Sequence, residues 1–241
     1  MNEESIKFRE RFLNKFTSLL SGNKKKLAEK LSKDIGTIAA VALVGNQNNS
    51  RMEVEVIAAI IKHLKPLDIH SFTVNPNKAI LVGRTPQGNI VHIHPQYRVA
   101  KPKRILAEGK QDYWYVDMAI KIYSSIDENT CIGLWGVEYD GHPQHFIETG
   151  VIKSHFRDVV IENETEMRPI HITKEGWSNY PDEYIRHMMN YFYRRVRDTE
   201  HMSLEDLRNT YWNVFETADF EVIGEGKIKR AVPWESIEIS K

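Results

Sequence analysis

Residues 113–158 read YWYVDMAIKIYSSIDENTCIGLWGVEYDGHPQHFIETGVIKSHFRD, and this stretch decides the fold. It contains two apolar runs, 114–123 and 131–139, that are rich in Val, Ile, Trp and Tyr. Such runs are typical of strands that are buried on both faces. Because the polar segment 124–130 between them is short, we predict an antiparallel hairpin.

Three carboxylates interrupt the apolar runs: Asp117 lies in the first, and Glu138 and Asp140 lie in the second. A turn at Asp127 and Glu128 places Asp117 opposite Glu138, where the Cβ atoms of cross-strand neighbours are about 5 Å apart. Glu138 and Asp140 are two residues apart on one strand, so their side chains point to the same face. We therefore expect three acids on one small patch, unless a register slip of one residue turns Asp117 away.

Carboxylates this close together repel one another, and acids are rarely buried unless they are paired or bound to a cation. Oxygen ligands of this type favour the hard cations Mg²⁺ and Mn²⁺. The spacing therefore predicts a divalent-metal site formed by Asp117, Glu138 and Asp140. The alternative is an acidic patch on an exposed hairpin face, although both strands are apolar apart from these acids and Lys121.

The composition is that of an ordinary globular protein: of 241 residues, 41% are apolar and 27% are charged. This length suits one large domain, or one domain with extensions. The formal net charge is zero, so any contact with nucleic acid must come from local patches. The single cysteine, Cys131, excludes an intrachain disulfide framework and favours a cytoplasmic location. We expect no secretory signal and no membrane span, because no apolar run reaches about 18 residues.

The segments before the hairpin are predicted to form helices at 6–20, at 24–44 and from Ser50 to about residue 64, and strands at 68–75, 79–82 and 90–94. Ser50 and Glu53 match a capping box. Glu53 and Glu55 lie near the first turn of the third helix, where the helix dipole favours negative charge; a catalytic role for one of them is the alternative. His92 and His94 form an H-x-H pair, but no third zinc ligand is obvious nearby.

A basic segment, 95–112, leads directly into the strand of Asp117 and is predicted to be a loop. Four of its cations are the best local candidates for contacts with a DNA backbone: Arg98, Lys101, Lys103 and Arg104. A solvated loop without a ligand explains them equally well.

After the hairpin we predict a helix at 149–163, a strand at 167–173 beside the hairpin, a turn at 176–179, a helix from Pro181, a helix capped by Ser203 and Asp206, and a terminal hairpin. The helix at 149–163 has a face at helical spacing that is expected to contact the core: Val151, Ile152, His155, Phe156, Val159 and Val160. The fold class is therefore α/β (α+β), with a central mixed β-sheet flanked by helices. We divide the chain into a helical N-terminal extension (1–45), a core (46–197) and a C-terminal helix and hairpin extension (198–241).

The order of these elements and acids resembles the PD-(D/E)XK, or restriction-endonuclease-like, nuclease superfamily over about residues 50–175. The runs VEYDGHPQHF and FRD are similar to the branch of this superfamily with an E-x-D-G…H strand, as in very-short-patch-repair endonucleases. This resemblance implies a restriction-endonuclease-like core and Mg²⁺-dependent cleavage of DNA, with Mn²⁺ able to substitute.

The resemblance also implies roles for the acids. Asp117 in YVDMAI matches the first metal-binding Asp of the family, and Glu138 in GVEYDG matches the second acid. Glu53 resembles the helix Glu that completes the acidic site in many members, with Glu55 as the competing candidate.

One position departs from the family pattern, because Asp140 stands where many members have a Lys. That Lys would stabilise the attacking hydroxide or the phosphate, whereas Asp140 can bind a metal ion or hold a water. His145 resembles the His that follows the D-G turn and is expected to act as acid, base or phosphate ligand. Arg157 and Asp158 match the helix R-D pair, which we interpret as scaffold.

The implied activity is that of a Mg²⁺-dependent endodeoxyribonuclease, similar to type II restriction enzymes. Its expected substrate is double-stranded DNA, and its expected assembly is a homodimer, because a double-strand cut usually requires two active sites. Three alternatives remain: a homing, repair or recombination nuclease; a nuclease-fold protein that binds nucleic acid without cleavage; and a metal-binding hydrolase or structural protein unrelated to DNA.

Overall fold

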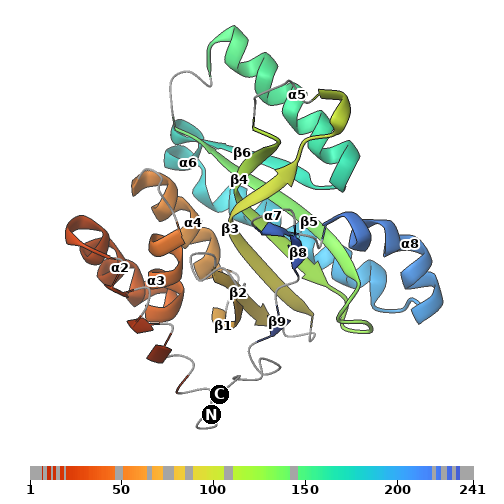
Figure 1. Cartoon of the computed structure of the whole chain (residues 1–241), viewed down its shortest axis with the longest axis horizontal. Helices are drawn as coiled ribbons and strands as arrows, with labels where there is room; N and C mark the ends of the chain where they lie inside the picture. Colours follow the sequence, from red (N-terminus) through yellow and green to blue (C-terminus); the bar gives the residue numbers. More distant parts are fainter. Residues whose placement is uncertain are drawn as a thin grey trace.

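The computed structural model describes residues 7, 10–11, 13–14, 17–18, 20–46, 51–63, 67–72, 79–84, 89–105, 111–141, 146–218, 221–223, 227–229 and 232–233. The architecture is mixed α/β: N-terminal helices are followed by a mixed sheet and by C-terminal helices that pack on it (Figure 1). The predicted mixed sheet with flanking helices is thereby confirmed.

The sheet has seven strands in the order β6-β5-β4-β3-β2-β1-β9. Four of them lie at or next to the predicted acidic patch: β3 (Ile90–Ala100), β4 (Tyr113–Tyr123), β5 (Cys131–Asp140) and β6 (Arg168–Thr173). Three shorter strands continue the sheet beyond β3: β2 (Ala79–Arg84), β1 (Leu67–Phe72) and β9 (Val232–Pro233). All neighbours are antiparallel except β5 and β6, which are parallel and joined by the crossover helix α5 (Glu148–Thr165).

The hairpin of β4 and β5 has the predicted register at its acidic end. Met118 pairs with Val137, which leaves Asp117 next to Glu138 on the neighbouring strand. The register shifts only near the turn, where the loop 124–130 connects the strands. The predicted hairpin is therefore confirmed, with its register as far as Met118; the ladder ends there, and Asp117 contacts β5 through its side chain.

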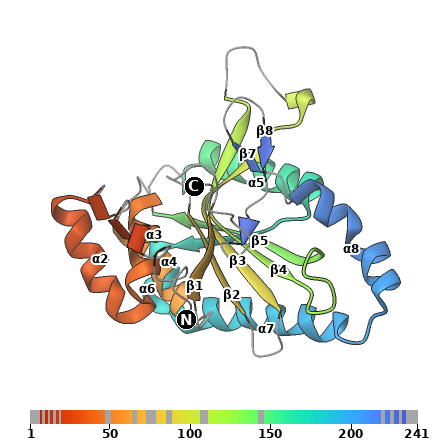
Figure 2. The same ribbon diagram turned by 60° about the horizontal axis from the view of Figure 1, so that its bottom comes forward.

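Helices α2 (Gly22–Ile35), α3 (Thr37–Asn46), α4 (Arg51–His63) and α7 (Pro181–Thr199) share one large core with the sheet. Sheet residues that point into this core, which we call the large core, include Ile93, Ile120 and Trp135. Figure 2 shows α2, α3 and α4 together on the left of the sheet, with α7 running beneath it. In the described part of the chain, residues of all three predicted segments join this core, and the boundaries after residues 45 and 197 stay predictions.

The prediction of one helix over 24–44 is wrong, because the chain breaks at Gly36 into α2 and α3. Gly36 has a φ of 82°, in the region that favours glycine, and its N–H donates to the Ser32 carbonyl. The break lets the apolar helix α3 turn into the core, while the lysine-rich surface of α2 stays exposed.

The opposite face of the sheet carries a smaller core, formed under the C-terminal half of α5. Ile161 and Met167 pack there against sheet residues such as Tyr123 and Leu134. Gly136 makes room for this contact, because a Cβ at that position would lie 2.6 Å from Met167 Sδ.

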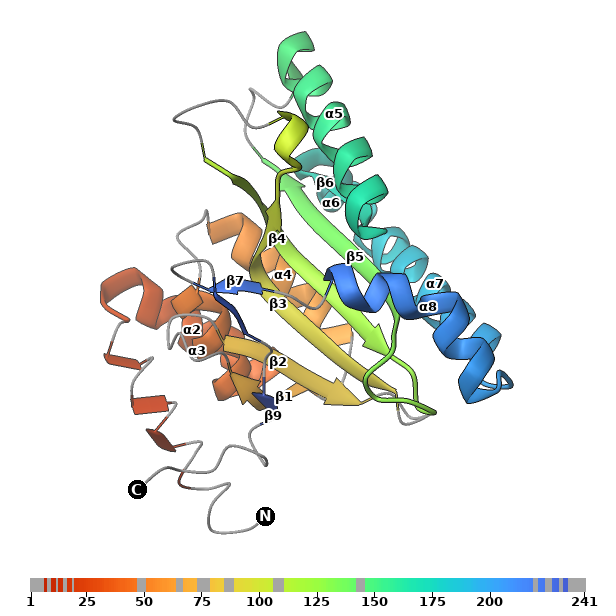
Figure 3. The same cartoon turned by 45° about the vertical axis from the view of Figure 1, so that its right-hand side comes forward.

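The predicted core-facing surface of α5 is largely exposed, so this prediction is wrong. Val160 and its neighbour Ile161 are buried, but His155 is exposed and four large apolar residues lie in solvent: Val151, Ile152, Phe156 and Val159. Figure 3 shows the reason, since the N-terminal half of α5 extends past the end of the sheet. Helical spacing located the apolar face correctly but did not say whether anything covers it.

The basic segment 95–112 is a loop only in part. β3 continues through Ala100, and its ladder passes Pro95, which pairs with Met118. Gln96 has a φ of 54°, so the strand bends there rather than ending. Arg98 is consequently a strand residue, whereas Lys103 and Arg104 lie on the short 3₁₀ helix η1 (Lys103–Ile105).

The C-terminal elements follow the predictions with one exception. Segment 176–179 is not a turn but belongs to α6 (Lys174–Asn179), which is capped because Gly176 N–H donates to Thr173 Oγ1 at 2.9 Å. The predicted capping box is confirmed at α8 (Leu204–Ala218), where Asp206 N–H donates to Ser203 Oγ at 3.1 Å. Strands β7 (Glu221–Ile223) and β8 (Lys227–Lys229) form the predicted antiparallel terminal hairpin.

Candidate active site

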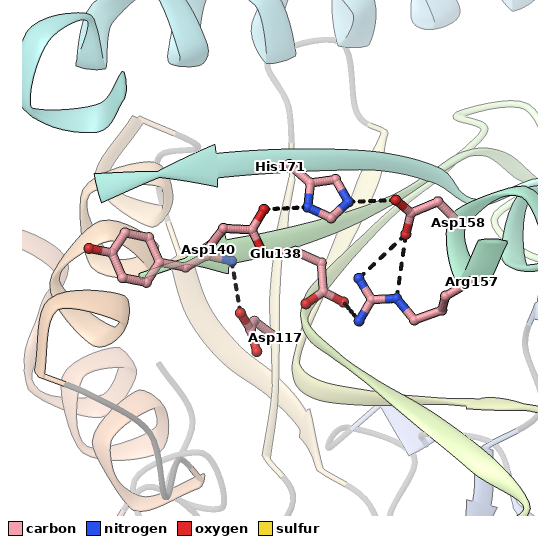
Figure 4. A network of polar contacts seen from close by, with 7 residues as sticks. Asp117, Glu138, Asp140, Arg157, Asp158 and His171 are labelled. Atoms are coloured by element: carbon pink, nitrogen blue, oxygen red, sulfur yellow. Dashed lines mark hydrogen bonds and ion pairs between the residues drawn. The ribbon is translucent and has the colours of Figure 1, made fainter. Parts of the chain in front are cut away.

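Six charged residues from four elements meet on the α5 side of the sheet (Figure 4). Asp117 comes from β4, Glu138 and Asp140 from β5, His171 from β6, and Arg157 and Asp158 from α5. The register between β5 and β6 explains why His171 lies beside the acids of β5, because Glu138 pairs with His171 in the parallel ladder. Alternation then puts Asp140 on the same face as Glu138. We call these six residues the charged cluster.

His171 lies between two carboxylates and contacts each with one ring nitrogen. Its Nδ1 is 2.6 Å from Asp140 Oδ2, and its Nε2 is 2.7 Å from Asp158 Oδ2. Hydrogen bonds to Asp140 and Asp158 raise the pKa of His171 to about 10, against the opposing effect of burial. His171 is therefore an imidazolium at neutral pH, and both of its N–H groups donate.

Glu138 is almost completely buried, at 8% exposure, and its only described cationic contact is poorly aligned. Arg157 Nη1 lies 3.3 Å from Glu138 Oε1, which is an ion-pair distance, yet this buried oxygen accepts no hydrogen bond in the described structure. Burial raises the pKa of Glu138 to about 8, although Arg157 acts to lower it. In the absence of a further cation, Glu138 therefore holds a proton at neutral pH.

Asp117 is held by the neighbouring strand. Tyr139 N–H donates to Asp117 Oδ2 at 2.8 Å, which fixes the carboxylate beside β5. Burial nevertheless raises the pKa of Asp117 above its ordinary value, against this hydrogen bond and the charge of Arg157. Asp117 and Glu138 thus share one property, a carboxylate whose negative charge is poorly compensated by the protein.

The charge balance of the cluster favours a divalent cation. When all groups are ionised, four carboxylates face two cations, Arg157 and His171, which leaves an excess of two negative charges. In the described part of the chain, however, no three His, Cys, Asp or Glu side chains are grouped closely enough to form a metal site by themselves. Asp140 is turned toward His171, so Asp117 and Glu138 are the ligands that fit a cation in this conformation. The buried, unbonded Glu138 Oε1 is the atom that fits best.

The structure does not bring Glu53 to the charged cluster. Glu53 is a buried residue of α4, and the residue whose pKa it affects is Tyr139. Tyr139 alternates with Glu138 and Asp140 along β5 and packs against the large core, so Glu53 lies on the other side of the sheet. The competing candidate, Glu55, forms ion pairs with Lys30 and Arg51 at 2.9 and 3.1 Å. His145 and His142 lie outside the described residues.

The four cations predicted to contact a DNA backbone lie near the C-terminal end of β3 and the N-terminal end of β4. Three of them have protein partners. Arg98 contacts two tyrosine rings, Lys101 Nζ donates to the Gln111 carbonyl at 2.7 Å, and Arg104 pairs with Glu164 at 2.6 Å. Lys103 is exposed on η1. These cations are therefore distributed over the end of β3 and the helix η1, and they do not lie together in one loop.

The H-x-H pair on β3 is packed among aromatic rings. The ring centroid of His92 is 4.6 Å from that of Tyr123, and the centroid of His94 is 5.4 Å from that of Tyr97. Burial lowers the pKa of His92 to about 3, and the charge of Lys121 acts in the same direction. This environment is that of a neutral core histidine.

Sequence reasoning missed His171 as a site residue and treated Arg157 and Asp158 as scaffold. A signal for His171 was present, because a strand paired in parallel with β5 must place one of its residues beside Glu138. The spacing did not reveal that register, since it depends on how far α5 carries the chain. For Arg157 and Asp158, the FRD motif was visible but its contacts were not.

Comparison of the chain with known protein families, with curated proteins and with solved structures finds no match. Among the described helices, none is both long and apolar enough to cross a membrane.

Proposed function

We propose that this chain is a metal-dependent nuclease with a restriction-endonuclease-like core, which hydrolyses phosphodiester bonds in DNA. The observation that carries the proposal is the pair of buried, poorly compensated carboxylates, Asp117 and Glu138, at the end of the central hairpin. The order of elements agrees with the superfamily pattern: a helix, an Asp strand, an E-x-D strand, a helix and a parallel strand.

In this proposal Asp117 and Glu138 hold Mg²⁺, with Mn²⁺ able to replace it. Mg²⁺ usually keeps several waters and needs only one or two carboxylates in addition to a substrate phosphate, so the absence of a third acidic ligand is acceptable. When bound, the ion supplies an activated water and polarises the scissile phosphate. The residues of the chain orient the ion and balance its charge.

The position of the missing family Lys also has an explanation. Asp140 holds the imidazolium of His171, and Arg157 lies beside Glu138, so two fixed cations stand next to the proposed metal ligands. Fixed positive groups of this kind stabilise the extra negative charge of a phosphodiester transition state. His171 and Arg157 therefore replace the Lys in charge, although they come from other elements.

The test is cleavage of supercoiled plasmid DNA in Mg²⁺ by the wild type, by Asp117→Asn and by Asp198→Asn. Asp198 is an exposed residue of α7 that pairs only with its neighbour Arg197 in the described structure, so it is a matched control for loss of one acid. We expect Asp117→Asn to reduce the cleavage rate by about 100-fold or more, and Asp198→Asn to leave it unchanged. Equal rates for the wild type and Asp117→Asn contradict the proposal.

A protein that binds nucleic acid without cleaving it is the second candidate. It is favoured by the engagement of Asp140 with His171 and by the lack of a three-residue metal group in the described regions. Calorimetric titration with Mn²⁺ separates the candidates, since a nuclease requires metal binding that Glu138→Gln weakens. The biological role within the nuclease proposal, whether restriction, homing, repair or recombination, depends on the DNA sequence or structure that is cut.

We also propose that the protein is a homodimer that assembles through the exposed apolar face of α5. Ile152 and Phe156 are 60% and 54% exposed on this face, which is unusual for large apolar side chains that lie one turn apart. A second copy is the occupant that we propose, because the same apolar face on a partner covers this one in a symmetric contact. The formal net charge of zero means that two copies do not repel each other at long range.

A further inference from the structure

The C-terminal end of β3 and the N-terminal end of β4 carry a cluster of one arginine and two tyrosines, Arg98, Tyr113 and Tyr115, which we call the Arg98 platform. The guanidinium carbon of Arg98 lies 4.4 Å from the ring centroid of Tyr113 and 5.4 Å from that of Tyr115. Arg98 Nε donates to the Tyr115 hydroxyl at 3.1 Å, and the two rings meet edge to face with centroids 5.1 Å apart. Three planar groups are thus fixed relative to one another.

The platform faces solvent and has an uncompensated charge. Tyr115 is 37% exposed, which is high for a strand tyrosine in the centre of a sheet. In the described regions no carboxylate forms an ion pair with Arg98, in contrast to Arg104, which pairs with Glu164. A cross-strand contact that only stabilised the strand ends would not need a guanidinium without a carboxylate partner, held by one half-buried and one exposed ring.

The surroundings of the platform have the same chemistry. Lys101 Nζ lies 5.5 Å from the ring centroid of Trp114, so a second pair of a cation and an aromatic ring lies at the same strand ends, on the α5 side of the sheet. Arg98, Lys101 and Tyr113 also line a pocket of about 290 Å³, near the lower limit of small-ligand pockets. The acids Asp112 and Glu164 also line this pocket, so it suits one flat, uncharged group rather than a large or anionic ligand.

The platform is close to the charged cluster. Tyr115 precedes Asp117 by two residues on β4, so their Cα atoms are at most about 7 Å apart. Arg98 is the residue paired with Tyr115 across the ladder. Trp114 and Val116, which flank Tyr115, pack in the small core on the α5 side, so the Tyr115 ring points to the other face of the sheet. A strand of nucleic acid that contacts both Asp117 and the platform therefore passes around the start of β4.

Nucleobases stack on tyrosine rings and on guanidinium planes with little dependence on sequence. Bases in an intact duplex already stack on one another and do not offer a free face. We propose that Arg98, Tyr113 and Tyr115 bind an unpaired nucleobase, so that the substrate is a single strand or an unpaired segment within DNA. Base binding by the platform needs no metal and does not depend on the proposed function. Only the statement that the bound nucleic acid is a substrate rests on the proposed nuclease activity.

The test is binding of fluorescently labelled DNA by the full chain in EDTA, where metal-dependent cleavage does not occur. A single-stranded oligonucleotide and a fully paired duplex of the same sequence are compared by fluorescence anisotropy. We expect the single strand to bind more tightly, and Tyr115→Leu to weaken its binding by about 5- to 100-fold. Tyr115→Phe keeps the ring and should retain most of the affinity, whereas Tyr193→Leu, a matched exposed tyrosine of α7, should have no effect.

A base analogue gives a readout that a change in folding alone does not imitate. With 2-aminopurine in the oligonucleotide, stacking on the platform should quench its fluorescence for the wild type and Tyr115→Phe, but not for Tyr115→Leu. Arg98→Gln is the second variant, in case Tyr115→Leu fails to fold, and it should weaken binding and reduce the quenching. Equal affinity for single strand and duplex, or affinity and quenching unchanged in Tyr115→Leu or Arg98→Gln, overturns the inference.

The same assay separates this inference from the proposed function. Asp117→Asn should bind the single strand as the wild type does in EDTA, even though it is expected not to cleave. If the wild type binds the single strand with the expected effects of Tyr115 and Arg98 but does not cleave DNA in Mg²⁺, the nuclease proposal is wrong and the platform inference stands. If cleavage depends on Asp117 but not on Tyr115 or Arg98, and single strands are not preferred, the platform inference is wrong and the nuclease proposal stands.

Discussion

The two sides of the sheet differ in what they bury. The large core, shared by α2, α3, α4 and α7, consists mostly of apolar side chains, with Trp135 and Ile120 fully buried. The α5 side combines a small apolar core with the charged cluster, where Glu138 and Asp140 are nearly inaccessible. Burying charged groups costs free energy unless they are paired, so the α5 side contributes less to stability than its packing would indicate. One side of the sheet thus stabilises the fold mainly by apolar packing, whereas the other side contains the charged groups on which the proposed function depends.

The largest effect on stability is expected from the large core. Trp135 is 1% exposed and packs edge to face on Phe192, with centroids 4.2 Å apart. Trp135→Ala should lower the free energy of unfolding by about 3–5 kcal/mol, measured by urea denaturation. Phe156→Ala, on the exposed face of α5, is the matched control and should change the free energy of unfolding of the monomer by less than about 0.5 kcal/mol. Similar losses in the two variants would remove the contrast between the two sides.

A smaller loss is expected when the cation between two acids is removed. His171→Gln leaves Asp140 and Asp158 facing each other without a positive charge between them. We expect a loss of about 1–3 kcal/mol in the free energy of unfolding. The double variant His171→Gln/Asp140→Asn removes one of the unpaired charges and should recover part of the loss. If the double variant is as unstable as the sum of the single changes, the residues do not act as a unit.

The metal-free protein should lose stability as the pH rises. The pKa of Glu138 is raised from 4.5 to about 8, so its favourable contribution is complete below pH 4.5 and disappears as the pH passes 8. The pKa of His171 is raised from 6.5 to about 10, so its contribution is complete below pH 6.5 and disappears as the pH passes 10. Both changes have the same sign, and we expect a loss on the order of 1 kcal/mol between pH 6 and pH 9 in EDTA.

Two controls define the source of this pH dependence. Glu138→Gln cannot ionise, so its stability should change less between pH 6 and pH 9 than that of the wild type. Mn²⁺ should offset the loss at pH 9, because a cation that displaces the Glu138 proton binds more tightly at high pH. A wild-type melting temperature that rises between pH 6 and pH 9 in EDTA would contradict the assignment of these groups.

The smallest effect on monomer stability is expected at the exposed face of α5, where the readout is assembly. Phe156→Glu should change the free energy of unfolding of the monomer by less than about 0.5 kcal/mol, yet convert the proposed dimer to monomer in sedimentation velocity. Lys153→Glu, on the same helix but at a polar position, is the control and should leave the dimer intact. A wild type that sediments as a monomer at all concentrations excludes this interface.

The placement of the acids on one side of the sheet was predictable from the sequence, because it depends on local rules. The short loop 124–130 fixes the partner of each residue, and alternation fixes the face of Glu138 and Asp140. The helix α4 was predictable from its apolar spacing in the same way, whereas its predicted cap, Ser50, lies outside the described residues. These features are determined by residues that are close in the sequence or that pair across one short turn.

The remaining features depend on distant parts of the chain. His171 joins Glu138 through a parallel pairing whose register is set by the path of α5, and no local pattern specifies it. The apolar spacing of α5 predicted a buried face, but the end of the sheet leaves Ile152 and Phe156 uncovered. Arg98 was assigned to a loop because segment 95–112 shows no clear period, whereas the ladder of β3 and β4 continues through Pro95 to Ala100.

The single parallel pairing has a consequence for the order in which the charged cluster assembles during synthesis. Asp140 and His171 are 31 residues apart, and Arg157 and Asp158 lie between them in the chain. The hairpin that carries Asp117 and Glu138 is complete before either of the two balancing cations, Arg157 and His171, has been made. Contacts between distant segments form more slowly than those across a hairpin. A nascent chain therefore presents these acids without their cationic partners until α5 and β6 pack against the hairpin.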